Sequence, residues 1–335
     1  MHVKKFILLG LLGLFSASLA SAQLINGAGS TFDYPAFTKW FDAYAKIDGE
    51  VRFNYQSIGS GGGQKQLLAQ TVDFGASDAP MTDDAMSKAP YKILHLPVVA
   101  GSVAVTYNLP GNPTLNFDAE TLAGIYLGKI TRWNDPKIAA LNSGVSLPDL
   151  SIVVVHRSDG SGTTFIFTDY LSVVSPEWAS SVGKSVSVKW PTGLGGKGSE
   201  GVSGQVKQLP GAIGYVEQAY ADQNHLPVAK LKNQAGEFVS PSAEAASKAM
   251  ATATIPEDFR FSMVNAPGSG AYPIAGASWV LIYQHQANAT NGKKLVAFLK
   301  WAVTEGQKLT PALSYAPLPE NVQQRELNLL GTVTY

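Results

Sequence analysis

Apolar residues recur along the chain with two different spacings. Over 51–55 they fall at every second position, which is typical of a half-buried strand. Over 37–44 they fall at i, i+3, i+4 and i+7, which places them on one face of a helix. The same patterns predict strands over 93–96, 103–107, 152–155, 213–216 and 279–283, and helices over 118–127, 163–171, 292–302 and 319–330. Because strands and helices alternate, we expect an α/β fold with mostly parallel central sheets flanked by helices.

Domain organisation follows from the chain length and from two passages of small residues. The 335 residues exceed what a single hydrophobic core usually holds. Residues 98–101 and 268–272 lie between apolar runs and would carry the chain from one lobe to the other. This predicts lobe I from 23–99 together with 272–335, and lobe II from 100–271. Two lobes joined in this way form a ligand cleft between them that closes by hinge motion.

The amino terminus predicts export. Lysines precede the apolar run 6–15, and Ala20 and Ala22 form the small-residue pattern of a signal peptide cleavage site. The apolar run is shorter than the roughly 20 residues that a membrane-spanning helix needs. We therefore expect residues 1–22 to be a signal peptide that is removed before Gln23. We also expect no membrane span in the mature chain and a periplasmic location.

Charge and cysteine content exclude several classes of function. The chain has 25 Lys and Arg against 25 Asp and Glu, so its formal charge is zero and it lacks the basic surface of a nucleic-acid binder. Without cysteine it has no disulfide scaffold, no cysteine nucleophile and no lipid-anchored amino-terminal cysteine. Its five histidines show no metal-ligand spacing. We expect no metal, no cofactor and no nucleic-acid partner.

Four short segments combine glycine or alanine with hydroxyl or charged side chains. They are 27–32 (GAGSTF), 59–63 (GSGGG), 76–80 (ASDAP) and 157–163 (RSDGSGT), and three of them precede a helical pattern directly. Glycines let backbone N–H groups converge, and a helix N-terminus carries about half a positive charge, so each segment can cradle an anion. A single cluster of this kind usually makes only a turn. Four in one chain favour an anion-binding site.

The segment around Arg157 is the most informative of the four. It leaves the predicted strand 152–155 and enters the helix that begins near Thr163, where open α/β sheets bind their ligands. The guanidinium of Arg157 is a planar fork that suits an oxyanion, and Asp159 could hold that fork in place. The alternative is a surface ion pair between the two side chains, which would contribute little.

Asp78 differs from the donor groups around it because an ionised carboxylate only accepts hydrogen bonds. Beside a bound anion it is repulsive unless the anion brings its own proton. Phosphate carries a P–OH group at neutral pH and sulfate does not, so Asp78 favours phosphate. The alternative is that Asp78 caps a helix or stabilises a turn before Pro80.

Seven motifs spread over the whole mature chain can be compared with known families. They are GAGSTF at 27–32, GSGGGQKQ at 59–66, TVDFGASDAP at 71–80, IYLGKITRWND at 125–135, RSDGSGTTF at 157–165, KWPTGLGGKG at 189–198 and LPGAIGYVE at 209–217. Together they resemble the periplasmic phosphate-binding proteins, the substrate-binding subunits of high-affinity bacterial phosphate ABC importers. The resemblance implies a two-lobed binding protein that delivers inorganic phosphate to the permease subunits of an importer. It implies no enzyme activity, and we expect a monomer.

The resemblance also implies which residues contact the phosphate. From lobe I these are Thr31, Phe32 through its backbone N–H, Ser60, and Asp78 as acceptor of the phosphate proton; from lobe II they are Arg157, Ser161, Gly162 through its backbone, and Thr163. Asp159 would be the partner that holds Arg157. One departure is visible, because Gly61 stands where the family often has a second serine.

Three other functions compete with this interpretation. A secreted phosphatase or phosphodiesterase would use the same cradle, with Ser60, Ser161 or Asp78 as nucleophile, but the sequence shows no paired-carboxylate metal cluster to activate it. A receptor for another oxyanion, such as sulfate or molybdate, is disfavoured by Asp78. Segment 193–198 (GLGGKG) matches a dinucleotide-binding pattern, but Pro191 interrupts the strand that should precede it.

Overall fold

The computed structural model describes residues 23–335, and the expected signal peptide, residues 1–22, lies outside this range. One eight-stranded sheet runs through the molecule in the order β2-β1-β3-β11-β4-β8-β6-β7. Its strands are β1 (Gln23–Gly29), β2 (Val51–Ser57), β3 (Phe74–Ser77), β4 (Ile93–Tyr107), β6 (Val153–Arg157), β7 (Leu194–Gly196), β8 (Ala212–Glu217) and β11 (Ala275–Tyr283). A smaller sheet joins β10 (Phe238–Val239), β9 (Lys230–Lys232) and β5 (Asn116–Phe117).

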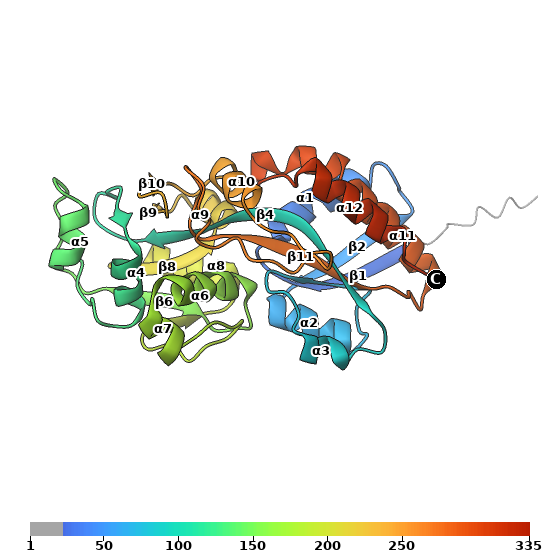
Figure 1. The fold of residues 1–335 in the computed structure, drawn as a ribbon, viewed down its shortest axis with the longest axis horizontal. Coiled ribbons are helices and arrows are strands. Elements are labelled where there is room, and N and C mark those ends of the chain that lie inside the picture. The colour runs from blue at the N-terminus through green and yellow to red at the C-terminus, as the bar shows by residue number, and fades with distance from the viewer. Residues whose placement is uncertain (1–22) are drawn as a thin grey trace, which may run out of the picture.

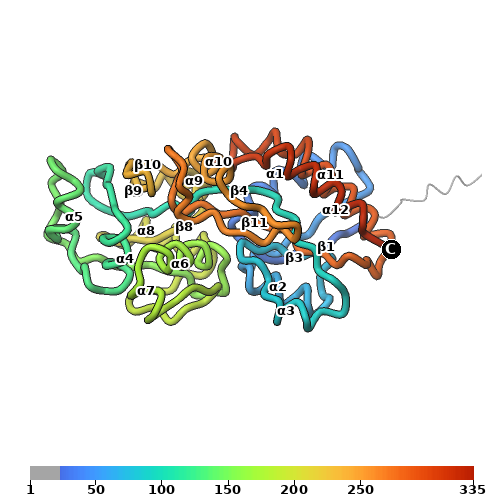
Figure 2. The backbone as a smooth tube through the Cα atoms, viewed as in Figure 1, coloured from blue at the N-terminus to red at the C-terminus, as the bar shows by residue number. Residues whose placement is uncertain are grey.

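Helices surround both ends of the large sheet (Figures 1 and 2). Around β1, β2 and β3 lie α1 (Tyr34–Tyr44), α2 (Ser60–Leu68), α3 (Asp83–Ser87), α11 (Ala289–Ala302) and α12 (Glu320–Leu330), with short 3-10 turns at Glu305–Leu309 and Pro311–Leu313. The other end carries α4 (Ala119–Tyr126), α5 (Pro136–Leu141), α6 (Gly162–Val174), α7 (Pro176–Ser181), α8 (Gly198–Gln208), α9 (Gln218–Asn224) and α10 (Ala243–Ala251). Within residues 23–335 no helix has the length and apolar composition to cross a membrane.

Strand β4 joins the two ends of the molecule. Its 15 residues are all buried, and it pairs with β11 over residues 93–102 and with β8 over 103–107. The strands expected over 93–96 and 103–107 are therefore one strand, and the small residues 98–101 form its middle. Small side chains are needed there because the strand crosses the packed centre: a Cβ added to Gly101 would lie 3.0 Å from the ring of Phe32. In Figure 1, β4 and β11 run side by side across the middle.

The expected α/β fold is confirmed, with one addition. Strands β1, β2 and β3 are parallel to one another, as are β6, β7 and β8, so each end has a parallel core. Strands β4 and β11 run antiparallel to their neighbours and fuse the two sheets into one. The helices expected over 37–44, 118–127, 163–171, 292–302 and 319–330 are present, each within a few residues of its expected bounds.

Candidate functional site

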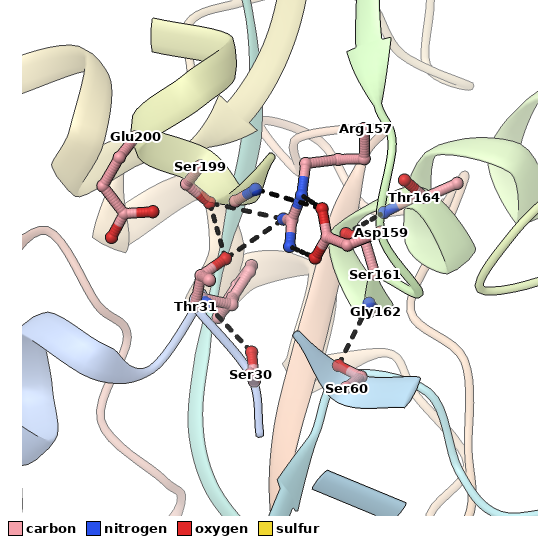
Figure 3. A network of polar contacts seen from close by, with 12 residues as sticks. Ser30, Thr31, Ser60, Arg157, Asp159, Ser161, Gly162, Thr164, Ser199 and Glu200 are labelled. Carbon is pink, nitrogen blue, oxygen red and sulfur yellow. Dashed lines mark hydrogen bonds and ion pairs between the residues drawn. The ribbon is translucent and has the colours of Figure 1, made fainter. Parts of the chain in front are cut away.

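The four segments singled out in the sequence meet at one place between the two ends of the sheet. Figure 3 shows three of them, at Ser30 and Thr31, at Ser60, and from Arg157 to Gly162. β1, β3 and β6 all end there, because parallel strands present their carboxyl ends at the same edge. The residues after β1 and β3 come from one end of the molecule, and those after β6 come from the other. The arrangement places side chains more than 100 positions apart in hydrogen-bond contact, such as Thr31 and Arg157.

Two helix N-termini face each other across this junction. Ser60 is the first residue of α2, and Gly162 is the first residue of α6. The Gly162 N–H donates to Ser60 Oγ at 3.0 Å, and the Gly61 N–H donates to the Gly160 carbonyl at 2.8 Å. Because the first turn of a helix carries unpaired N–H groups and a partial positive charge, two N-termini at one point favour a bound anion.

Arg157 is held rigidly by Asp159. Its Nε donates to Oδ1 at 2.8 Å and its Nη2 donates to Oδ2 at 2.5 Å, and Asp159 also accepts the Gly198 N–H at 3.0 Å. The Arg157 side chain is 2% exposed, so the alternative of a surface ion pair is wrong. Burial acts to raise the pKa of Asp159, but the hydrogen bonds and charge of Arg157 lower it below its usual range. The remaining terminal nitrogen, Nη1, donates to Thr31 Oγ1 at 3.0 Å.

The residues after β1 are also buried at the junction. Thr31 Oγ1 shares a hydrogen bond with Ser199 Oγ at 2.8 Å, and its carbonyl accepts from the Tyr220 hydroxyl at 2.7 Å. The backbone N–H of Phe32, which was expected to face an anion, donates to Ser30 Oγ at 2.9 Å. The Phe32 ring is fully buried.

Asp78 lies directly after β3 and is 2% exposed. Its Oδ1 accepts from the hydroxyls of Ser30 and Ser278, the latter at 2.7 Å, and its Oδ2 lies 3.5 Å from Ser60 Oγ. Burial raises the pKa of Asp78 to about 6, while the serine hydroxyls and the charge of Arg157 act to lower it. The alternative role as a helix cap is wrong, because α3 begins at Asp83 and is capped by Thr82.

The first turn of α6 supplies hydroxyl groups from the other side. Ser161 Oγ accepts the Thr164 N–H at 3.1 Å and so caps the helix. The Thr163 hydroxyl is buried and makes no hydrogen bond within the described residues. A buried donor of this kind is expected to be paired, and an anion oxygen would pair it.

Four further residues belong to the same network and were not assigned from the sequence: Ser30, Asp33, Ser199 and Ser278. Ser30 lies inside the GAGSTF motif, so the signal was present but unused. Ser199 follows the GLGGKG segment, which forms β7 and leads into α8, and the Gly198 N–H at the start of that helix bonds Asp159. Ser278 is an isolated hydroxyl in an apolar strand and gives no local signal.

Metal chemistry has no evident place among the described residues. In residues 23–335 no cluster of three or more His, Cys, Asp or Glu side chains could hold a metal ion. His95 accepts the Met81 N–H at 3.0 Å through Nε2, and His156 stacks on Trp190 with ring centroids 4.7 Å apart. Burial lowers the pKa of both histidines.

Comparison with known proteins assigns the family. A family model described as PBP superfamily domain matches residues 16–305. The phosphate-binding protein PstS of Pasteurella multocida is 47% identical over 326 residues, covering 96% of this chain and 94% of that protein. PstS of Haemophilus influenzae is 46% identical, with 90% and 91% covered. A solved phosphate-binding protein from Stenotrophomonas maltophilia shares the fold, with a TM-score of 0.70 at 20% identity and 91% and 93% covered. The chain therefore belongs to the PBP superfamily and, within it, to the family of the phosphate-binding protein PstS.

Proposed function

We propose that this chain binds inorganic phosphate in the periplasm and delivers it to the permease subunits of an ABC phosphate importer. The observation that carries the proposal is the buried carboxylate of Asp78 among groups that can donate hydrogen bonds to an anion, such as Ser60 and Arg157. The PstS relatives of Pasteurella multocida and Haemophilus influenzae, named phosphate-binding proteins, support it at 47% and 46% identity.

The proposed phosphate contacts come from both lobes. They are Thr31, the Phe32 backbone, Ser60 and Asp78 on one side, and Arg157, Ser161, the Gly162 backbone and Thr163 on the other. Asp159 holds the guanidinium of Arg157, and the Thr163 hydroxyl gains the partner that it lacks among residues 23–335. The P–OH of phosphate donates to Asp78, an interaction that sulfate cannot make.

Binding without catalysis suits the environment of Ser60, one of the three candidate nucleophiles. Ser60 Oγ accepts the backbone N–H groups of Gly162 and Asp78, at 3.0 Å and 3.1 Å. Its lone pairs therefore face amides, and a nucleophile needs them free to attack phosphorus. We infer a binding protein, exported by residues 1–22 and active as a monomer.

A titration of the purified mature protein tests the proposed function. Calorimetry is expected to find one phosphate bound per chain, and incubation with p-nitrophenyl phosphate and divalent metals is expected to release no p-nitrophenol. The proposal would be overturned if titration with phosphate released or absorbed no heat and unlabelled phosphate displaced no labelled phosphate from the protein. Steady release of p-nitrophenol would instead favour the phosphatase.

The lobes proposed are residues 23–99 with 272–335, and 100–271. Their support is that β4 exchanges its partner β11 for β8 between residues 102 and 103, and that β11 begins at Ala275. Phosphate gains hydrogen bonds from both lobes only when they are closed, so its binding favours the closed state.

Replacing Gly162 by alanine is expected to prevent this closure. An added Cβ would lie 2.4 Å from Ser60 Oγ and 2.5 Å from the Cβ of Asp78, both on the opposite lobe. Gly162→Ala should weaken phosphate binding at least tenfold, about the scale of an overpacked contact. In X-ray scattering, the variant should lose the compaction that phosphate produces in the wild type.

Gly204→Ala is the matched control, because it lies in a helix of the same lobe where an added Cβ meets nothing within 4 Å. It should bind and close like the wild type. If Gly162→Ala also bound phosphate and became compact like the wild type, the contact between Gly162 and Ser60 would not be part of the interface that closes.

A further inference from the structure

A second buried carboxyl lies behind Asp78. Asp33 follows the GAGSTF motif, is fully buried, and precedes α1 without making a side-chain cap to that helix. Its Oδ2 lies 2.7 Å from the hydroxyl of Ser278, and the same hydroxyl lies 2.7 Å from Asp78 Oδ1. One serine on β11 therefore bridges two buried carboxyl groups.

The hydrogens available in this network can be counted. Ser278 has one hydroxyl hydrogen, which can be donated to only one of the two carboxyl groups. The hydrogen of Ser30 is directed to Asp78, and the Tyr55 hydroxyl lies 2.7 Å from the Ser30 carbonyl but 3.3 Å from Asp33 Oδ1. If Asp33 and Asp78 were both ionised, one of the two 2.7 Å contacts of Ser278 Oγ would have no hydrogen between its oxygen atoms. One carboxyl must therefore carry a proton.

The surroundings assign that proton to Asp33. Asp78 receives hydroxyl donors from Ser30 and Ser278 and is attracted by Arg157. From other residues within 23–335, the Asp33 carboxyl has the contact to Ser278 and a longer one to the Tyr55 hydroxyl, and no cation pairs with it. Burial first, and the charge of Asp78 second, raise the pKa of Asp33 well above its usual range.

Other titratable groups near the pair do not supply a counter-charge to Asp33. Burial raises the pKa of Tyr55 on β2, of Tyr315 and of Glu217 at the end of β8, which favours the neutral form of the carboxyl of Glu217. Arg157 on β6 is the cation that acts on Asp78, and its fork is engaged by Asp159.

We propose that Asp33 is a protonated, buried acid that holds Asp78 ionised and oriented for phosphate. Asp33 donates its proton to Ser278 Oγ in a hydrogen bond, and Ser278 donates its own to Asp78 Oδ1. Asp78 Oδ1 thereby receives its hydrogen bonds from residues of lobe I. Asp78 Oδ2 faces Gly162 of lobe II, because a Cβ added to Gly162 would lie 2.5 Å from this oxygen. Oδ2 is the atom left to accept the ligand P–OH. Asp33 and Ser278 are positioning residues, and the inference rests on the proposed phosphate-binding function.

The protonation state of Asp33 is measurable without any ligand. Infrared difference spectra of the mature protein at neutral pH should show the carbonyl band of a protonated carboxylic acid. Buried neutral carboxyls such as that of Glu217 contribute to this band in every variant. The spectrum of Asp33→Asn subtracted from that of the wild type should therefore contain a protonated-acid band, and the same subtraction with Asp78→Asn should not. If Asp33→Asn removed only carboxylate bands, Asp33 would be ionised and the inference would be overturned.

Binding variants test the positioning role. Asp33→Ala and Ser278→Ala should each narrow the phosphate-to-sulfate affinity ratio by roughly tenfold or more at neutral pH, the scale of a lost hydrogen bond to a charged group. Asp33→Asn should restore most of the ratio, because its amide N–H replaces the acid O–H as donor to Ser278. If asparagine at position 33 restores the phosphate-to-sulfate ratio, the side chain acts as a neutral hydrogen-bond donor to Ser278 and its negative charge is not needed.

Ser102→Ala is the matched control, since Ser102 is a buried serine on the adjacent strand β4 whose hydroxyl donates to the Ser242 carbonyl at 3.3 Å. It should keep the wild-type ratio. The inference fails if Asp33→Asn binds phosphate tenfold more tightly than the wild type, or if Ser278→Ala matches Ser102→Ala. If the wild type binds no phosphate, the proposed function fails, and the infrared result still decides the state of Asp33.

Discussion

Phosphate binding is expected to weaken by at least ~2 kcal/mol when Arg157 is replaced by alanine, the scale of removing one partner from a buried charged pair. The guanidinium connects the two sides of the site, because it pairs with Asp159 and donates to Thr31. Its removal leaves the Asp159 carboxylate, 14% exposed, with the Gly198 N–H as its remaining donor from another residue within the described chain. An uncompensated negative charge then lies beside the incoming anion.

Lysine at the same position should recover only part of the loss. Its ammonium restores the charge but cannot bond Asp159 with two parallel N–H groups while donating to Thr31. The expected order of affinity is therefore wild type, then Arg157→Lys, then Arg157→Ala. Calorimetric titration with phosphate measures all three.

Arg132→Ala provides the control for loss of an arginine from the same lobe. Arg132 pairs with Asp149 on the surface, where the two side chains are 48% and 71% exposed. Such a pair contributes little, so phosphate affinity should remain that of the wild type. Wild-type affinity in Arg157→Ala as well would show that the lobe II half of the site is misplaced.

Sequence patterns were sufficient for the parts of the site that lie at strand ends. The segments at the ends of β1, β3 and β6 each combine glycine or alanine with hydroxyl or charged residues, and parallel strands bring such ends together. The pairing of Arg157 with Asp159 was predictable because the two residues are close in sequence and each requires a partner when buried. The amphipathic helices α1 and α11 were predictable from their spacing alone.

The rest depended on contacts that local sequence does not encode. Strand β4 is buried on both faces, so it lacks the alternation that marks a strand, and its small residues 98–101 resemble a linker. Ser278 and Asp33 are 245 positions apart and meet only because β11 lies next to β3. The state of a carboxyl such as Asp33 follows from that packing, since burial and a second carboxylate determine it.

Discrimination between phosphate and sulfate is expected to be the property most sensitive to Asp78. A site that accepts a hydrogen bond from a ligand O–H can reject an analogue without it by about 10⁴ to 10⁵. In the wild type, sulfate presents a bare oxygen to a buried carboxylate, and no hydrogen separates the two negative groups. Sulfate should therefore compete negligibly even in large excess.

The pH dependence of this discrimination has a defined sign. Because burial raises the pKa of Asp78 to about 6, the side chain is ionised and accepts the P–OH above that pH. As the pH falls through about 6, Asp78 gains a proton and becomes a donor that sulfate can also use. The phosphate-to-sulfate ratio of the wild type should narrow over that range, as competition titrations at several pH values would measure.

In Asp78→Asn the phosphate-to-sulfate affinity ratio should be narrow at every pH. Asparagine keeps the size of the side chain and removes the charge, and its NH₂ donates to either anion. Phosphate binding should survive while sulfate binding rises. Asp169→Asn is the matched control, because Asp169 is also buried but bonds Lys184 and Ser262, at 2.6 Å and 2.8 Å, and should keep the wild-type ratio.

Two results would contradict the role assigned to Asp78. An unchanged sulfate-to-phosphate ratio in Asp78→Asn would show that this carboxylate does not sense the ligand proton. Strong sulfate binding by the wild type would go further, because the donors around Arg157 and Thr163 would then bind any tetrahedral oxyanion. The site would in that case select its ligand by charge and size, and the buried carboxylate would have to be explained by the packing of β3 against β11 alone.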